Sequence, residues 1–456
     1  MARILEIHLI HSFPTSNMNS DDKGDPKEGT LGGVPRARIA SAPIKNVARV
    51  SMAGMAHLAG TAPGPDNWLC SGDVVASMRT VRLPAHIERE LGLLRRDPLE
   101  AKRVGVAMMQ IAGIKMGEGG RTAQILMLSP RAAAALVGLA QRHFDAVLKA
   151  GLGVAAEEAE TKEAREAGDP EAGVPEGEDP PAQKAGQRAP KAKGKLPAGL
   201  KEEILAAIAG RSDEARSTPL DQAMFGRFLA NDPLAQVDAA FAVAHYIGVS
   251  RLYREDDFFT AHDTEARPPE ARAALLSYTA LTAPTFYGYI SINVDALIAN
   301  LHGDRGLAGR ALRAFLAAMS TIVPTGKQNS TAPYTRPEFF MLTVRDTLPF
   351  SLVNAFTTPV EPPRAGEPGD LTDRAIAALD AHARGMARMY GPGSLGHTFA
   401  ATAREVPLAT LRLVDGPKIG EGGTAEAVAE KAAVAGAMER GLVTAAIEGA
   451  MARVGL

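Results

Sequence analysis

One stretch near the middle of the chain limits most strongly what the chain can fold into. Residues 155–195 contain a single large apolar side chain, Val174, so they cannot bury enough surface to offset the entropy lost on ordering. Residues 157–179 hold ten acidic and two basic residues, whereas residues 184–195 hold five basic residues and no acidic one. We therefore expect a disordered, charge-divided linker between two ordered parts of the chain.

The net charge of the whole chain conceals this division. The formal charge is −2, and such a near-neutral balance by itself argues against a nucleic-acid binder. Residues 157–179 alone contribute −8, so the rest of the chain carries a net charge of +6. The near-neutral charge of the whole chain is therefore set by this acidic segment, and it does not by itself argue against nucleic-acid binding.

Composition also excludes several classes of protein. The single cysteine, Cys70, rules out a disulfide framework and a zinc site built from several cysteines, and it suits a reducing cytosol. The longest apolar runs fall short of the ~18 residues that span a bilayer. The N-terminal residues lack the pattern of a signal peptide. We expect a cytoplasmic protein that makes no use of a membrane.

The hydrophobic pattern predicts a mixture of strands and helices, which is an α+β fold class. We expect strands at residues 3–11, 36–39, 122–128, 287–293 and 339–344. We expect helices that begin near residue 41 and that span residues 85–94, 98–114, 130–152, 294–301, 308–322 and much of the tail from residue 371. Residues 12–34 read as a long polar loop, residues 237–249 as a strand or a helix, and residues 250–286 as an irregular excursion.

No pattern indicates catalysis or a metal site. His8, His11 and the pair Asp21-Asp22 have no metal-ligand spacing, so they favour histidines in or near the core beside an Asp-rich loop. The glycine clusters at residues 117–120 and 420–423 lack the spacing of a phosphate-binding loop. Nothing near Cys70 would lower the pKa of its thiol. We expect no enzyme, no metal and no cofactor.

A basic stripe is the first candidate binding feature. Arg36, Arg38, Lys45 and Arg49 occur within fourteen residues that contain no acid, and Lys27 lies just upstream. Ser41 is a good helix N-cap, after which Lys45 and Arg49 share one helix flank. Two interpretations of the stripe are equally good: a surface that follows backbone phosphates, and a basic face that is merely solvated.

Two further segments leave alternatives open. The helix that ends before residue 323 leads into a Pro/Gly turn presenting Lys327, Gln328 and Asn329, which either donate to phosphates or are merely exposed. Phe225, Phe228 and the aromatic pair within residues 256–260 stand out in a chain with 5% aromatic residues. They are either core anchors or exposed platforms on which bases stack.

The motifs together resemble one known family. Five of them are Ile7-His-Leu-Ile-His-Ser-Phe-Pro14, Asn19-Ser-Asp-Asp22, Leu31-Gly-Gly33, Arg36-Ala-Arg-Ile-Ala-Ser41 and Phe225-Gly-Arg-Phe228. Others are Asp257-Phe-Phe-Thr-Ala261, Val323-Pro-Thr-Gly-Lys-Gln328 and Leu348-Pro-Phe-Ser-Leu-Val-Asn-Ala-Phe356. Their order and spread resemble CasC, the backbone subunit of the type I-E CRISPR Cascade complex.

The resemblance implies an RRM-like (ferredoxin-like) palm with an inserted helical finger domain and a thumb β-hairpin. It divides the chain into palm segments at residues 1–49, 216–249 and 287–456, the last including a helical tail. The finger insertion is then residues 50–215, with the linker at 155–195, and the thumb hairpin is residues 250–286.

The resemblance also assigns roles to residues. The RNA-binding set is Asn19, Lys27, Arg36, Arg38, Ser41, Lys45, Arg49, Lys327, Gln328 and Asn329. Phe228 and Phe259 are expected at the place where the RNA is kinked and a base is displaced.

The function implied is that of a non-catalytic scaffold. Copies of the chain would line up along one CRISPR RNA, kink it at regular intervals and present it for pairing with target DNA, together with other Cascade subunits. The alternative is an RNA-cleaving backbone subunit that uses Asp21 or Asp22 and a metal ion.

Overall fold

The structure is a computed structural model of the whole chain. It describes residues 3–58, 69, 73–150, 196–212, 218–227, 236–262, 273–411 and 441–456. The expected linker at residues 155–195, Cys70, Phe228 and the glycine cluster at residues 420–423 lie outside the described residues.

The chain divides into two compact units. Unit 1 consists of Met1–Val75 and Ala239–Leu456, and unit 2 consists of Ala76–Asp238. Unit 2 is therefore an insertion in the sequence of unit 1.

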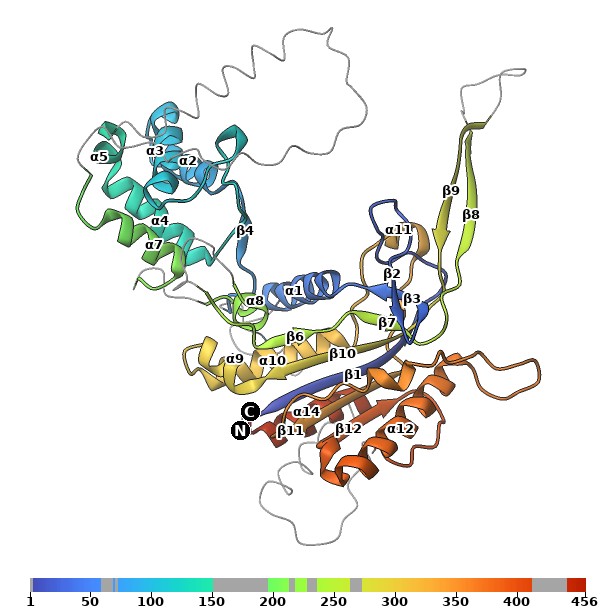
Figure 1. Cartoon of the computed structure of the whole chain (residues 1–456). Coiled ribbons are helices and arrows are strands. Elements are labelled where there is room, and N and C mark those ends of the chain that lie inside the picture. Colours follow the sequence, from blue (N-terminus) through green and yellow to red (C-terminus); the bar gives the residue numbers. More distant parts are fainter. Residues whose placement is uncertain are drawn as a thin grey trace. The chain divides into compact units, whose positions relative to one another are not determined.

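The described part of unit 1 contains an eight-stranded sheet (Figure 1). Along the main path the order is β12-β11-β1-β10-β7-β3-β2, with β6 beside β10, and all of these pairs are antiparallel. The strands are β1 (Ile4–Ser12), β2 (Glu28–Leu31), β3 (Val34–Ile39), β6 (Phe241–Val243), β7 (Tyr246–Gly248), β10 (Thr285–Asn293), β11 (Phe339–Arg345) and β12 (His397–Thr402). The expected mixed α+β fold is confirmed.

Strand β1 lies near the centre of this sheet and is buried on both faces. Because side chains alternate along a strand, Leu5, Ile7 and Leu9 point to one face, and Ile4, Glu6, His8 and Ile10 point to the other. Helices cover both faces, which explains why the sequence of β1 does not alternate cleanly between apolar and polar residues.

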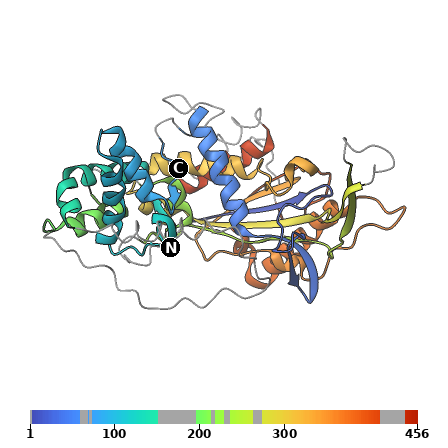
Figure 2. The ribbon, with the colours of Figure 1, turned by 90° about the horizontal axis from the view of Figure 1, so that it is seen from above.

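The first face packs against α1 and α10, which lie next to each other (Figures 1 and 2). Helix α1 presents Ile44, Ala48, Met52 and Ala56 at a helical spacing of four, and all four are buried. The second face packs against α12, in a core that includes Ile10, Tyr287 and Ile376. The helices of unit 1 are α1 (Ser41–Leu58), α9 (Val294–Asn300), α10 (Arg305–Met319), α11 (Gln328–Thr331), α12 (Leu371–Tyr390) and α14 (Leu442–Val454), with short 3-10 turns η3 (Val353–Phe356) and η4 (Pro392–Leu395).

A charged pair is buried beneath the second face. The Glu6 carboxylate accepts hydrogen bonds from Arg345 Nε, the Tyr289 hydroxyl and the Phe350 N–H. Burial raises the pKa of Glu6, and the nearby Arg345 opposes that rise. Because the carboxylate accepts from a residue of each neighbouring strand and of the segment after β11, it ties these parts together.

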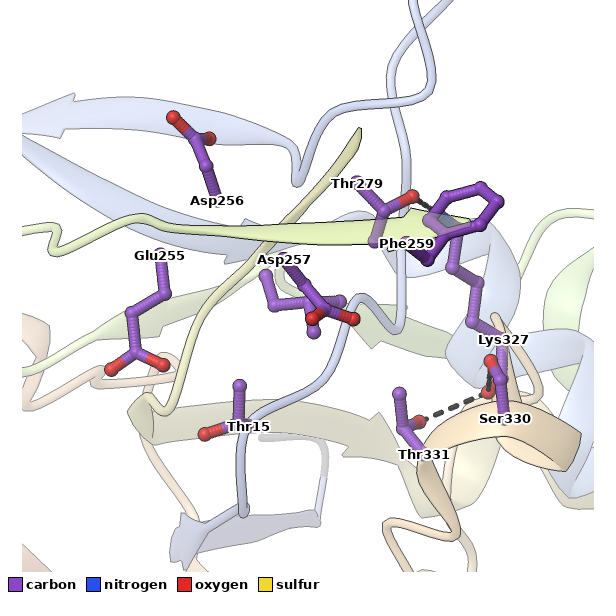
Figure 3. Close-up of a pocket in the computed structure, with 10 residues that line it drawn as sticks. Thr15, Glu255, Asp256, Asp257, Phe259, Thr279, Lys327, Ser330 and Thr331 are labelled. Atoms are coloured by element: carbon purple, nitrogen blue, oxygen red, sulfur yellow. Dashed lines mark hydrogen bonds between the residues drawn. The ribbon is translucent and has the colours of Figure 1, made fainter. Parts of the chain in front are cut away.

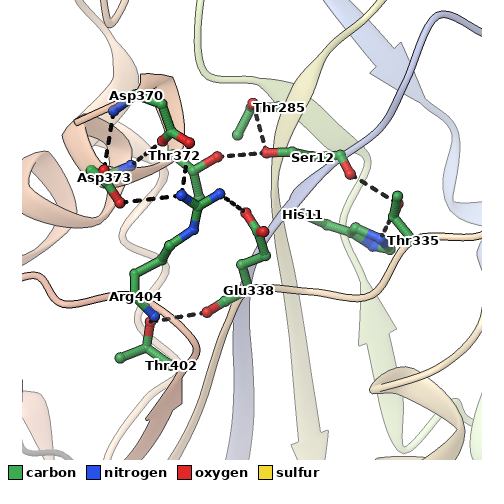
Figure 4. Close-up of polar contacts among 10 residues, drawn as sticks. All are labelled: His11, Ser12, Thr285, Thr335, Glu338, Asp370, Thr372, Asp373, Thr402 and Arg404. Atoms are coloured by element: carbon green, nitrogen blue, oxygen red, sulfur yellow. Dashed lines mark hydrogen bonds and ion pairs between the residues drawn. The ribbon is translucent and has the colours of Figure 1, made fainter.

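A polar network closes the end of the sheet where β1 ends (Figure 4). The Ser12 hydroxyl contacts the hydroxyls of Thr285 on β10 and Thr372 on α12, at 2.9 and 2.7 Å. Close by, Arg404 donates to Glu338 and Asp370. These bonds fix the place at which the chain leaves β1.

A separate hairpin extends from unit 1 (Figure 1). Strands β8 (Glu255–His262) and β9 (Ala273–Leu281) pair antiparallel with each other and lead directly into β10. The interpretation of residues 250–286 as an irregular excursion is wrong for this part of the chain.

Unit 2 is mainly helical. Its core includes Leu83, Val104, Leu136 and Ile204 from four different helices. The elements are β4 (Met78–Thr80), α2 (Leu83–Leu93), α3 (Pro98–Ile111), η1 (Glu118–Gly120), β5 (Leu126–Leu128), α4 (Pro130–Arg142), α5 (Phe144–Lys149), α7 (Leu200–Ala209) and α8 (Leu220–Phe225).

Most expected elements of regular structure are confirmed. Residues 237–249, left open between a strand and a helix, contain two short strands. Two further expectations need correction. The helix expected over residues 130–152 is interrupted at His143. The polar loop expected to continue to residue 34 contains β2 and a tight turn into β3, because Gly32 and Gly33 both take positive φ, as such hairpin turns require.

None of the helices described by the structure is long and apolar enough to cross a membrane.

The buried histidines predict how stability depends on pH. Burial lowers the pKa of His8 and of His11 to about 3, so the folded chain takes up their protons far less readily than the unfolded chain. Their contribution is therefore complete above pH 6.5 and is lost as the pH falls towards 3. When the pH is lowered from 7.5 to 5.5, we expect each of these two histidines to reduce the free energy of unfolding by about 1 kcal/mol.

Urea unfolding of wild type and His11→Gln at both pH values measures this loss. The variant should lose less stability between pH 7.5 and 5.5 than wild type does. An equal loss in the two proteins would contradict a buried, neutral His11.

Candidate nucleic-acid interface

Three segments far apart in the sequence meet at one end of the sheet. Strand β1 runs antiparallel to both β10 and β11, so its last residue lies beside the first residues of those two strands. The loop that follows β1, the hairpin that precedes β10 and the segment that precedes β11 therefore start from the same place. Backbone hydrogen bonds extend the pairing, with Ser16 and Thr282 bonded in both directions and the Glu338 N–H donating to Ile10.

The loop after β1 folds back onto the start of α1. The Asn19 carbonyl accepts from the Lys27 N–H, and the Lys27 carbonyl accepts from the Arg38 N–H, at 2.8 and 2.9 Å. The Asn19 side chain accepts from the Ala40 N–H at 2.8 Å, next to Ser41 at the start of α1. The structure thus brings Asn19, Lys27, Arg38 and Ser41 together.

The turn that contains Lys327 packs directly against the loop that follows β1. A Cβ added to Gly326 would lie 2.4 Å from the Met18 carbonyl oxygen and 2.9 Å from that of Asn17, so only glycine allows this approach. The neighbouring Lys327 is exposed, takes a φ of +44° and donates through Nζ to the Thr279 hydroxyl at 2.6 Å. The buried residues Asn17 and Met18 therefore join the turn at Gly326 to the loop after β1, and Lys327 joins it to the base of the hairpin.

The basic flank of α1 continues this region. Lys45 follows one turn after Ser41, and Arg49 follows one turn later. Partial burial and the positive charge of Arg49 both lower the pKa of Lys45. Like charges four residues apart on a helix are unfavourable, and an anion bound beside them would relieve the repulsion.

Arg36 is a correction to the predicted binding set. It is 0% exposed, and its guanidinium donates to the carbonyls of Gly248, Val249, Phe356 and Thr357 at 2.9–3.3 Å. In this structure the side chain joins β3 to β7 and to the segment after η3 and does not reach the surface. We therefore leave Arg36 out of the interface, whereas Arg38 on the same strand is only partly covered and contacts His245.

The aromatic side chains of the hairpin are exposed. Phe259 is 42% exposed, and Phe258 and its cross-strand partner Tyr278 are 67% and 69% exposed. The core-anchor alternative is therefore wrong for this pair of phenylalanines. Phe228, expected beside Phe259, lies outside the described residues, so its placement stays a prediction.

The remaining predicted residues lie on the short helix α11 or in the acidic loop. Gln328 and Asn329 begin α11, where the hydroxyls of Ser330 and Thr331 donate to the Lys327 carbonyl. Asp21 Oδ1 accepts from the backbone N–H groups of Lys23 and Asp25, which is the structural role expected of an Asp-rich loop.

His8 and His11 are buried, as expected. In the part of the chain that the structure describes, no three histidine, cysteine, aspartate or glutamate side chains gather as metal ligands.

Several residues of this region were not expected from the sequence. Arg254 at the base of the hairpin forms ion pairs with Asp25 and Glu28, both at 3.3 Å, which links the hairpin to the loop after β1. His245 and Thr279 contact Arg38 and Lys327. The register of the hairpin places Thr279 opposite Asp257, and His245 belongs to the pair Ala244-His245, one of the motifs that carry the family resemblance.

Comparisons with known proteins bear on the family and the fold of the chain. No curated protein matches the chain. A structure entitled "CRISPR RNA-guided surveillance complex, pre-nicking" contains a chain with 26% sequence identity and a TM-score of 0.68, over 90% of this chain and 95% of that one. A second, "CRISPR RNA-guided surveillance complex", has 23% identity and a TM-score of 0.59 over 90% and 96%, and supports the fold alone. The family model of the CT1975-like proteins matches residues 5–416, so this chain belongs to the CT1975-like family of CRISPR-associated proteins.

Proposed function

We propose that the chain is a non-catalytic, RNA-binding backbone subunit of a type I-E-like CRISPR surveillance complex. Several copies bind side by side along one CRISPR RNA and present it for pairing with target DNA, in company with other subunits of the complex. Family membership and the similarity to chains of RNA-guided surveillance complexes support this proposal.

The observation that carries the proposal is the convergence at the end of the sheet. The turn around Lys327 is far along the sequence from the loop after β1 and the flank of α1, yet Lys27, Arg38, Lys45 and Lys327 lie on connected elements of unit 1. Backbone N–H groups and lysine or arginine side chains are the groups that hold phosphates without reading sequence. A guide scaffold needs such a grip, because base pairing reads the target.

In this proposal the sheet of unit 1 is the palm, unit 2 is the finger insertion, and β8–β9 is the thumb. The exposed aromatic side chains of the thumb then meet bases at the kinks of the RNA. The RNA-cleaving alternative gains no support from the geometry, because Asp21 Oδ1 is already used by two N–H groups of its own loop.

Removing two proposed phosphate contacts should weaken RNA binding and reduce its salt dependence. For Lys45→Ala with Lys327→Ala we expect the slope of log K against log salt to become less negative by about 1.4, since each contact on single strands contributes about 0.7. The loss should be similar for guides of different sequence. Titration of fluorescent single-stranded RNA at several salt concentrations measures it.

A charge-matched control is Arg384→Ala with Arg388→Ala on α12, which covers the opposite face of the sheet. That variant should keep the wild-type slope. If both double variants changed the salt slope equally, the proposal that RNA binds on the α1 side of the sheet would be wrong.

The close approach at Gly326 predicts a second effect. In Gly326→Ala the new methyl group collides with the Met18 carbonyl, so the two loops must separate. We expect RNA affinity to fall several-fold, with about 1–3 kcal/mol of destabilisation. Gly385→Ala is the control, because its Cβ meets nothing within 4 Å inside helix α12, and it should leave RNA binding unchanged. Wild-type RNA affinity in Gly326→Ala would show that the contact between the loops is dispensable.

The substitution Arg36→Met tests whether Arg36 stabilises the fold or contacts RNA. It removes the guanidinium donor from four carbonyl oxygens, of which that of Val249 still accepts from the Val360 N–H, and we expect a loss of about 3 kcal/mol in unfolding free energy. The salt slope of RNA binding by the folded fraction should stay at the wild-type value. A flatter slope with unchanged stability would instead return Arg36 to the interface.

A further inference from the structure

A pocket lies between the base of the hairpin and helix α11 (Figure 3). Its volume is about 840 Å³, within the range of sites that hold small molecules or single nucleotides. It is lined by Thr15, Glu255, Asp256, Asp257, Phe259, Thr279, Leu281, Lys327, Ser330 and Thr331. All of these residues belong to unit 1, and Phe259 and Lys327 also belong to the interface described above.

The acidic side chains of the hairpin do not all face this pocket. Because side chains alternate along β8, Glu255, Asp257 and Phe259 share one face. Asp257 lies in the middle of the residues drawn in Figure 3, whereas the Asp256 carboxylate points away from the others. The pocket thus combines an aromatic ring with two carboxylates, and Asp256 offers the same charge on the other side of the strand.

The charges in the pocket orient a nucleotide. Lys327 Nζ is held by Thr279, which stands opposite Asp257 in the hairpin. A phosphate is attracted to Lys327 and repelled by the carboxylates, so the backbone of a bound strand must pass on the lysine side. The base then points towards Asp257 and Glu255, with the Phe259 ring available for stacking.

A carboxylate distinguishes between the bases by their donors. An ionised carboxylate only accepts hydrogen bonds, and it can accept two parallel ones. Guanine offers two adjacent donors, N1–H and the N2 amino group. Uracil offers the single N3–H between two carbonyl oxygens, which a carboxylate repels.

We propose that this pocket takes one base of the bound RNA and, through Asp257, favours guanine over uracil. The inference rests on the proposed RNA-binding function and adds to it a base preference within an otherwise sequence-independent grip.

The test uses the full-length chain and single-stranded RNAs of equal length. The strands are identical except at isolated positions that carry guanine, inosine or uracil. We expect the guanine strand to bind on the order of tenfold more tightly than the uracil strand. Inosine, which keeps N1–H and lacks the amino group, should fall between them.

Asp257→Asn and Asp256→Asn form a matched pair, since each removes one negative charge from the same strand. We expect Asp257→Asn to bring the guanine-to-uracil ratio close to one, and Asp256→Asn to keep the wild-type ratio. A rise in affinity for all strands that both variants share reflects only the loss of one negative charge and not a change in base preference.

The possible failures are distinguishable. Equal affinity of the wild-type chain for all three strands, with strong salt dependence, would overturn the base preference and leave RNA binding intact. A ratio lost equally in both variants would overturn the assignment to Asp257. Failure to bind any of the strands would overturn the proposed function together with this inference.

Discussion

The antiparallel pairing of β1 with both β10 and β11 is the constraint on which the rest of the structure depends. It places the end of one strand beside the beginnings of two others that follow about 270 and 330 residues later in the chain. The loop after β1, the hairpin before β10 and the segment before β11 leave the sheet at this end, and Asn19 links the first of them to the start of α1. A shift of one residue in either register would exchange the two buried faces of β1 and separate Glu6 from Arg345, so the packing of both faces holds the convergence in place.

Buried charged groups hold the sheet itself together. The Glu6–Arg345 pair lies towards the opposite end of β1 and anchors the segment after β11, and Arg36 anchors β3 to β7 and to the end of η3. Breaking a buried ion pair is costly, so these charges serve the fold and are not available to a ligand. The cations that we propose contact RNA lie on loops and on the flank of α1, where they are partly or fully exposed.

Sequence reasoning reached the fold class and most strands and helices because their hydrophobic periods are strong. The hydrophobic pattern missed strand β12, which is short and lies in an alanine-rich tail, and the hairpin β8–β9, which begins with three acidic residues that disfavour a strand. Only the family resemblance predicted a hairpin within residues 250–286. Arg36 and Arg38 share a face of β3, so alternation could not separate them. The residue that covers Arg36, Phe356, lies 320 positions away. The contact of Gly326 with Met18 likewise has no local signal.

The most direct test of the central claim is ultraviolet crosslinking of the chain to single-stranded guide RNA, with the crosslinked peptides mapped by mass spectrometry. The account predicts crosslinks in the loop after β1, in the hairpin around Phe258 and Phe259, and in the turn around Lys327. Crosslinks confined to α12 and the opposite face of the sheet, with none in these three segments, would contradict it.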